Sequence, residues 1–301
     1  GLPKNIELQV PAKAGGGTDV VARAIATQVG KDSGSNLTVQ NNTDGSGVVA
    51  MEKVRSAKPD ASSLLFFHTT MLIKTATGVY DHSAVDDFTV IAVGQGTEKT
   101  GYVLVVPGDS PYNTTEDLVE AAKAAPGSIL MGVETGGSSH IMSGLFAKAT
   151  GIDVKYVEAG SDTEKLTALV GGSINAALVN QNQAKQYVES GKAKALGCFS
   201  VDETGGESAI LPGVTSFVDQ GYDCTFTTLF LVLGPKDMKA ETVTALHDYF
   251  ESAVVNPEVQ NVLKPAGFDM TFFSQEEGLQ KVKDQQESLN GVVDMLGLKQ
   301  K

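Results

Sequence analysis

The sequence predicts an α/β protein built from two domains. Short β-branched segments alternate with segments of helical periodicity along almost the whole chain, which is typical of parallel sheets with crossover helices. The 301 residues suffice for two domains, and no internal repeat or long linker interrupts the pattern. Two glycine-rich turns join a predicted strand to a predicted helix. In open α/β sheets, such turns lie where ligands bind.

The strands are predicted from short runs rich in β-branched and aromatic residues. The first run, Ile6 to Val10, is apolar and enters a glycine-rich turn, and later runs follow at regular intervals. The predicted strands cover residues 6–10, 37–40, 64–68, 89–93, 103–106, 129–133, 154–157, 174–179, 195–199 and 228–233.

The helices are predicted from apolar residues that recur every three or four positions between these strands. This spacing places the apolar side chains on one face, which can pack against a sheet. The predicted helices cover residues 20–29, 48–57, 116–125, 141–149, 164–170 and 243–254.

Two polar segments mark the expected domain boundaries. Residues 94–101 are punctuated by glycine between two strands, and residues 221–225 precede another strand. We expect the chain to leave the first domain at one segment and return at the other, so that residues 1–99 and 226–301 form one domain and residues 100–225 the second. Two connecting strands of this kind form a hinge, which suits closure of a cleft on a ligand.

The opening glycine turn is the strongest candidate for an anion site. Lys13, Ala14 and three glycines lie between the first strand and the first helix, and Thr18 or Asp19 can cap that helix. The unpaired N–H groups of the first helical turn and the helix dipole favour negative charge there. Neither a P-loop lysine nor the spacing G-x-G-x-x-G is present, so a small carboxylate fits better than a nucleotide. An ordinary βα turn remains the alternative.

A second turn, residues 135–140, repeats this arrangement and adds the hydroxyls of Ser138 and Ser139 ahead of a helix from about Ile141. Further polar turns follow strands at residues 68–70, 158–162 and 180–183, the last of which also fits a solvated loop. The candidate ligand-binding residues are Lys13, Ala14, Gly15, Gly16, Gly17, His68, Thr69, Thr70, Thr135, Gly137, Ser138, Ser139, His140, Gly160, Ser161 and Asn180.

Composition excludes several other functions. Lys and Arg number 23 against 36 Asp and Glu, a net charge of −13, which disfavours nucleic acid or an anionic membrane as partner. No apolar run reaches the roughly 20 residues of a membrane span. Arg23 and Arg55 are both predicted within helices, so an arginine clamp on the ligand is not expected. We expect no catalytic residues, no metal and no cofactor, because nucleophile, metal-ligand and dinucleotide motifs are all missing.

Two features bear on the cellular compartment. The chain begins at Gly1 without Met, which fits a precursor from which a secretion signal was removed, or a start chosen for expression. Cys198 and Cys224 lack C-x-x-C spacing. The sequence fits either two buried thiols or one disulfide between them.

Several segments, in order along nearly the whole chain, resemble the extracytoplasmic solute-binding proteins of tripartite tricarboxylate transporters, the TctC or Bug family. Gly15, Gly16, Asp19 and Arg23 resemble the family's opening Pro-Gly-Gly-x-x-Asp-x-x-x-Arg, with Ala14 in place of the proline. Similar matches occur at residues 132–141, 144–146, 150–152, 168–174, 211–215, 220–222, 256–259 and 267–268.

The resemblance implies a two-domain type II periplasmic-binding-protein fold with a carboxylate ligand in the cleft between the lobes. It also implies that the opening loop reaches the carboxylate through water and the second loop holds it by hydroxyl and backbone donors. Two departures bear on the ligand. Glu158, Ala159 and Gly160 replace a common Tyr-Lys-Gly, and the chain has no Trp. If Glu158 faces the cleft, it repels a second carboxylate and favours an amino acid or a monocarboxylate; if it faces solvent, Gly160 and Ser161 alone touch the ligand.

We therefore expect an exported, monomeric, non-enzymatic receptor, free or lipid-anchored, in the periplasm or another extracytoplasmic space. It is expected to bind a small mono- or dicarboxylate or an amino acid and deliver it to the permease subunits of a tripartite tricarboxylate transporter. The alternatives are an enzyme that uses the same cleft, which turnover of the ligand would reveal, and a ligand sensor that docks a signalling protein.

Overall fold

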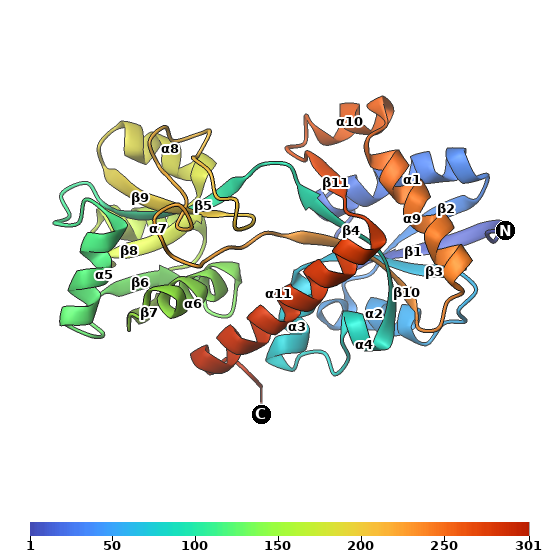
Figure 1. Cartoon of the computed structure of the whole chain (residues 1–301), viewed down its shortest axis with the longest axis horizontal. Helices are drawn as coiled ribbons and strands as arrows, with labels where there is room; N and C mark the ends of the chain where they lie inside the picture. Colours follow the sequence, from blue (N-terminus) through green and yellow to red (C-terminus); the bar gives the residue numbers. More distant parts are fainter. Residues whose placement is uncertain (301) are drawn as a thin grey trace. The chain divides into compact units, whose positions relative to one another are not determined.

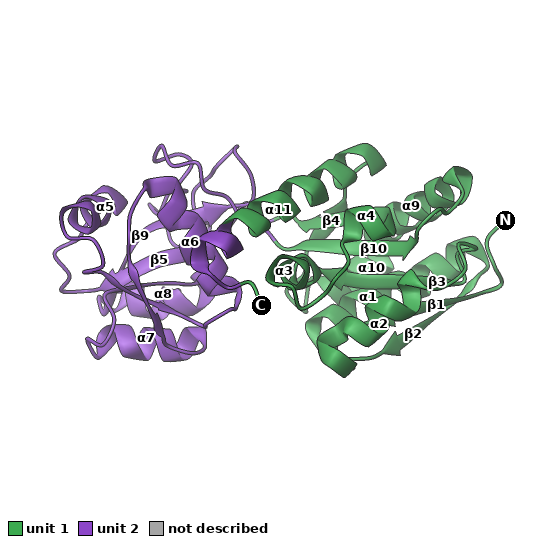
Figure 2. Cartoon of the chain, turned by 90° about the horizontal axis from the view of Figure 1, so that it is seen from below, with its two compact units in different colours: residues 1–97, 228–291, 299–301 green, residues 98–227, 292–298 purple. Residues whose placement is uncertain are grey.

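The computed structural model describes residues 1–300, which form two compact units (Figures 1 and 2). Unit 1 contains Gly1–Thr97, Thr228–Gly291 and the chain from Lys299, and unit 2 contains Glu98–Thr227 and Val292–Leu298. The sequence placed all of residues 226–301 in the first domain. The last helix instead ends in unit 2, where a Cβ on Gly144 would lie 2.7 Å from Val292 and Leu296.

Unit 1 is built on a six-stranded sheet with the strand order β11-β4-β10-β3-β1-β2. Its strands are β1 (Asn5–Val10), β2 (Asn36–Asn41), β3 (Ser63–His68), β4 (Phe88–Gly96), β10 (Leu229–Pro235) and β11 (Met270–Phe272). Strands β1, β2 and β3 are parallel, whereas β10 runs antiparallel to both β3 and β4. Val10 and His68 therefore end neighbouring parallel strands at one edge of the sheet.

The helices of unit 1 pack on this sheet or on the helices that cover it. The helices are α1 (Gly17–Ser33), α2 (Val48–Arg55), α3 (Thr70–Thr77), α4 (Ala84–Asp87), α9 (Ala240–Val254), α10 (Pro257–Leu263) and α11 (Gln275–Leu296), with the 3-10 turn η1 (Asp44–Gly47). Helix α10 packs on α1 and α9. Val21, Ile25 and Val29 recur every four residues in α1 and are fully buried. They pack with Leu8 and Phe250 in the main core of the unit, and Gly34 ends α1 in the left-handed conformation.

Unit 2 is built on a five-stranded sheet with the strand order β7-β6-β8-β5-β9. Its strands are β5 (Thr100–Pro107), β6 (Leu130–Val133), β7 (Lys155–Glu158), β8 (Ala176–Asn180) and β9 (Ala193–Ser200). Its helices are α5 (Thr115–Ala124), α6 (Ser138–Thr150), α7 (Asp162–Val170) and α8 (Gln181–Glu189). Strands β6, β7 and β8 are parallel, so the loops that follow them gather at one edge of the sheet.

The structure confirms the α/β class and all ten predicted strands, but both sheets are mixed rather than parallel. Strand β5 is antiparallel to β8 and β9, as β10 is to its neighbours. The sequence missed β11 and the helices α3, α4, α8, α10 and α11. Residues 180–183, read as a solvated loop or a donor turn, begin helix α8 instead, with Asn180 as its N-cap.

Two open points of the sequence are settled by this fold. Cys198 and Cys224 are free, buried thiols rather than a disulfide, and burial raises the pKa of Cys198 to about 12. Within residues 1–300, no helix has both the length and the apolar character needed to cross a membrane.

Candidate functional site

The opening loop, residues 11–16, follows β1 and leads into α1 in unit 1. Gly15 adopts φ = 84°, the left-handed region that favours glycine, and the amide of Gly16 donates to the carbonyl oxygen of Lys13 at 3.1 Å. Gly17 lies so close to the Phe268 ring that a Cβ there would be 2.8 Å from it. Among the described residues, the amides of Gly17 and Thr18 find no protein acceptor, so these two donors remain available.

Asp19 holds the opening loop in shape. Its side chain is 3% exposed and accepts hydrogen bonds from the Gly15 amide at 2.8 Å, from Asn41 Nδ2 at 2.9 Å and from Arg23 Nε at 2.9 Å. Burial raises the pKa of this carboxyl, but the three hydrogen bonds outweigh it and keep the pKa below its usual value. The sequence predicted Thr18 or Asp19 as the helix cap; Gly16 is the N-cap, and Asp19 reaches back to Gly15 instead.

The second loop, residues 134–137, reproduces the opening loop in unit 2. Gly136 has φ = 79°, and the Gly137 amide donates to the carbonyl oxygen of Glu134 at 2.8 Å. Gly137 is the extended N-cap of α6, which begins at Ser138, three residues before the predicted start. In the part of the chain that the structure describes, the amides of Ser138 and Ser139 have no protein acceptor. Each unit therefore presents unpaired amides at the start of a long helix.

Two side chains at the start of α6 accept hydrogen bonds from amides of the second loop and so stabilise its conformation. Ser139 is 4% exposed, and its hydroxyl oxygen accepts from the Glu134 amide at 3.0 Å. His140 Nδ1 accepts from the Gly136 amide at 3.1 Å, as Asp19 does from Gly15. Burial lowers the pKa of His140, so the ring is neutral near pH 7 and carries its proton on Nε2. The acceptor in this loop is thus uncharged, whereas the acceptor in the opening loop is an anion.

Glu158 is exposed to solvent, one of the two surroundings considered from the sequence, yet its carboxylate is engaged by backbone amides. It ends β7, and its Oε2 accepts from the Thr135 amide at 2.7 Å while its Oε1 accepts from the Gly160 amide at 3.1 Å. Hydrogen bonds from the Thr135 side chain and amide hold the pKa of Glu158 below its usual value. The side chain is solvent-exposed, yet its carboxylate bridges the loops that follow β6 and β7.

The other predicted residues of unit 2 cap helices beside these loops. Ser161 accepts from the Glu164 amide at the start of α7, and Asn180 accepts from the Asn182 amide at the start of α8. The sequence analysis missed Lys165, a buried lysine whose Nζ lies 3.0 Å from Asp162 Oδ1. The sequence could have indicated that Lys165 is buried, because it lies four positions before the apolar Leu169 and therefore on the same face of the helix.

His68, Thr69 and Thr70 end β3 and begin α3 in unit 1. The hydroxyl of Thr69 donates to Gln285 at 2.7 Å and accepts from the Leu229 amide, which commits it to the fold. His68 Nδ1 accepts from the Thr70 amide at 3.2 Å. Burial, with the nearby charge of Lys74, lowers the pKa of His68 to about 4. His68 is therefore neutral near pH 7, with Nε2–H as its free donor.

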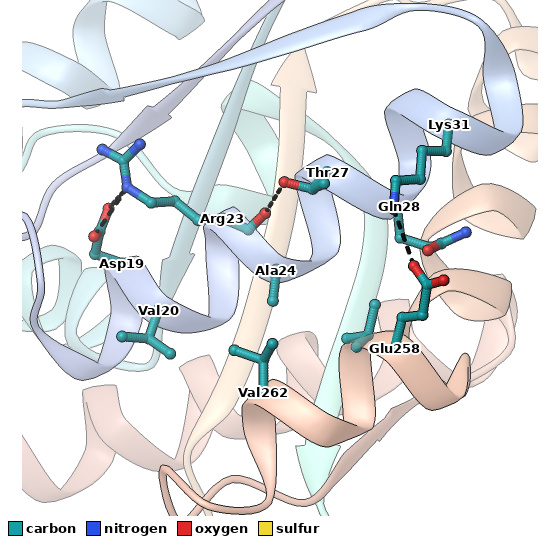
Figure 3. Close-up of a pocket in the computed structure, with 10 residues that line it drawn as sticks. Asp19, Val20, Arg23, Ala24, Thr27, Gln28, Lys31, Glu258 and Val262 are labelled. Atoms are coloured by element: carbon teal, nitrogen blue, oxygen red, sulfur yellow. Dashed lines mark hydrogen bonds and ion pairs between the residues drawn. The ribbon is translucent and has the colours of Figure 1, made fainter.

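A groove of about 440 Å³ lies between α1 and α10 in unit 1 (Figure 3). Its floor is apolar, and its charges are already paired: Arg23 with Asp19, and Lys31 with Glu258 at 2.9 Å. The cations of this groove are neutralised by their own neighbours, so it offers less to an anion than the loop amides do.

Three side chains of unit 1 approach one another closely enough for a metal, although the sequence predicted none. Ligand atoms of His247, Asp248 and Glu251 lie within 4.8 Å of one another. Nε2 of His247 lies 2.8 Å from the carbonyl oxygen of Phe273, and both carboxylates are largely exposed. The histidine is thus engaged by the backbone, and the group fits an ordinary surface network.

Comparison with known proteins identifies the family of this chain. The model of the family described as the tripartite tricarboxylate transporter family receptor, TctC, matches residues 21–298. A UPF0065 protein of Cupriavidus necator is 26% identical, over 97% of this chain and 88% of its own.

Two solved structures share the fold. A TctC solute-binding protein from Polaromonas superposes with a TM-score of 0.82 at 24% identity, and the match covers 97% of this chain and 98% of that one. A protein of R. palustris, Rpa4515, was solved with adipate; its TM-score is 0.63 at 21% identity, over 97% of both chains.

Proposed function

Because this chain belongs to the TctC family of tripartite tricarboxylate transporter receptors, we propose that it captures a small organic carboxylate outside the cytoplasm and delivers it to the permease subunits of such a transporter. The family is one of receptors and not of enzymes. The two glycine loops support the proposal most directly, because each is followed by backbone amides that are unpaired at the positive end of a helix.

The proposed donors are the amides of Gly17 and Thr18 in unit 1 and of Ser138 and Ser139 in unit 2. Backbone amides suit this task in a chain of net charge −13, because they attract a carboxylate without an added cation. Nε2–H of His68 is a further proposed donor, since it stands at the carboxyl edge where β1 also ends.

We propose that the ligand bridges the two units and that the monomeric receptor closes on it, as the sequence led us to expect. A ligand held by both units stabilises the closed protein relative to the open and unfolded forms. X-ray scattering at saturating ligand tests this point: identical profiles with and without ligand would contradict closure.

Carboxylate capture is tested by a thermal-shift panel of adipate, hexanoate and proteinogenic amino acids on the purified protein. A true ligand at a free concentration of about 100 times its Kd stabilises the native state by about 2.7 kcal/mol, which raises Tm by several degrees. Mass spectrometry of small molecules released from freshly purified protein gives an independent identification. A panel and an extract that both lack a stabilising carboxylate would contradict the proposal.

Replacing Ser138 with proline is expected to weaken binding of the stabilising carboxylate about tenfold or more, because it deletes one charge-assisted amide donor. Proline is well tolerated at the first position of a helix, and Gly137 already has the extended conformation that a residue before proline requires. Ser138→Ala, which keeps the amide, is the matched control. Equal affinities of the two variants by calorimetry would remove Ser138 from the site.

A further inference from the structure

Two loops of unit 2 share a single carboxylate. Strands β6 and β7 are parallel neighbours, with Val133 paired to Glu158, so the loops that follow them lie side by side. From the end of β7, Glu158 reaches both: one oxygen accepts from the Thr135 amide and the other from the Gly160 amide. Gly160 has φ = 75°, in the left-handed region that favours glycine. The Thr135 and Gly160 amides therefore already bind an anion, which is the carboxylate of Glu158 itself.

We propose that Glu158 is a resident carboxylate that occupies the Thr135 and Gly160 amides in place of a ligand carboxylate, and thereby selects ligands that present only one carboxylate to unit 2. This inference rests on the proposed function of a carboxylate receptor. With these two donors filled, the amides of Ser138 and Ser139 at the start of α6 are backbone donors beside the second loop that no described acceptor occupies.

The surrounding charges act in the same direction. Four acidic residues lie at or after the ends of β6 and β7, and Lys165 is a cation beside them; the acidic residues are Glu134, Glu158, Asp162 and Glu164. Lys165 is 2% exposed and already paired with Asp162 at 3.0 Å. A second ligand carboxylate would therefore meet an uncompensated negative charge, while a hydroxyl, an ammonium or an alkyl group would not.

A purely structural brace is the competing interpretation of Glu158, and amide signals of the ligand-free protein test occupancy directly. In ¹H–¹⁵N spectra, we expect the Thr135 and Gly160 amides to shift together as Glu158 is protonated, with a midpoint below 4.5, the ordinary carboxyl value. The Ser138 amide serves as the internal reference. Glu158→Gln is expected to abolish the shared titration. A wild-type protein in which these two amides do not titrate together would overturn the occupancy.

Selectivity is tested with adipate and hexanoate, which have six carbons each but two carboxylates and one. Glu158→Ala frees both amides and removes the like charge, so the affinity for adipate relative to hexanoate is expected to rise about tenfold. Glu158→Gln removes the charge but keeps an acceptor, so its affinity for adipate relative to hexanoate is expected to lie between those of the wild type and Glu158→Ala. Glu189→Ala, the same change at an exposed residue of α8, is expected to leave the ratio unaltered.

The results separate this inference from the function on which it rests. Wild-type protein that binds hexanoate, with an adipate ratio unchanged in Glu158→Ala, would leave the receptor intact and reduce Glu158 to a brace. If the wild-type protein binds neither probe and the panel and the extract also lack a stabilising carboxylate, carboxylate capture is contradicted and the selectivity with it, while the amide titration still decides whether Glu158 holds the two donors. Circular dichroism of each variant verifies that the loops are compared in folded protein.

Discussion

Replacing Asp19 with alanine is expected to lower the free energy of unfolding by about 2 to 3 kcal/mol, because it removes a buried carboxylate that accepts three charge-assisted hydrogen bonds. The Gly15 amide loses its acceptor, whereas Asn41 Nδ2 still donates to the Ala12 carbonyl oxygen and Arg23 still donates to Asn41 Oδ1 from its half-exposed side chain. The loss is therefore smaller than for a fully buried ion pair. Urea unfolding monitored by circular dichroism measures it.

Asp32→Ala is the matched control on the same helix, since Asp32 is exposed and accepts only from Gln28. Its effect is expected to stay within about 0.5 kcal/mol. The free energy of unfolding of Asp19→Asn is expected to be close to that of Asp19→Ala. The asparagine amide nitrogen must face a donor where the carboxylate offered an acceptor. An unfolding midpoint of Asp19→Ala equal to that of the wild type would show that the opening loop does not depend on this network.

Acidification from pH 6.5 to 4 is expected to reduce the free energy of unfolding by about 3 kcal/mol through His68 alone. Burial lowers the pKa of His68 from 6.5 in the unfolded chain to about 4 in the folded one. Between these values the unfolded chain binds more protons, so stability falls as pH falls. The contribution is fully present above about pH 6.5 and is lost as pH drops toward 4.

His68→Asn tests this dependence, because the asparagine oxygen can replace Nδ1 as acceptor for the Thr70 amide but does not titrate. The variant is expected to be less stable at neutral pH, from lost packing against Phe67 and Phe230, yet to show a flatter decline in acid. The same substitution at His82, a partly exposed histidine of unit 1, is expected to leave the slope near that of the wild type. Parallel slopes for His68→Asn and wild type would contradict the assignment.

The family and most secondary structure were predictable because both depend on local signals. Val21, Ile25 and Val29 reveal the buried face of α1 by spacing alone, and the glycine turns are recognisable because a left-handed residue followed by an extended cap demands glycine. The missed α8 carries mostly polar residues, and Gln181 and Ala184 are its buried ones, so few apolar residues mark the helix in the sequence. Helix α11 was missed for a similar reason, since polar residues dominate its sequence.

What the sequence by itself determined was the α/β class, the positions of the strands and the two turns whose amides lie unpaired at helix starts. Only the tertiary structure decided the antiparallel courses of β5 and β10, because strand direction depends on pairing partners far along the chain. It also decided that Glu158 reaches the Thr135 amide, 23 residues away, across two parallel strands. A local pattern encodes which face of an element is buried; which donor meets which acceptor depends on the loops that the sheet brings together.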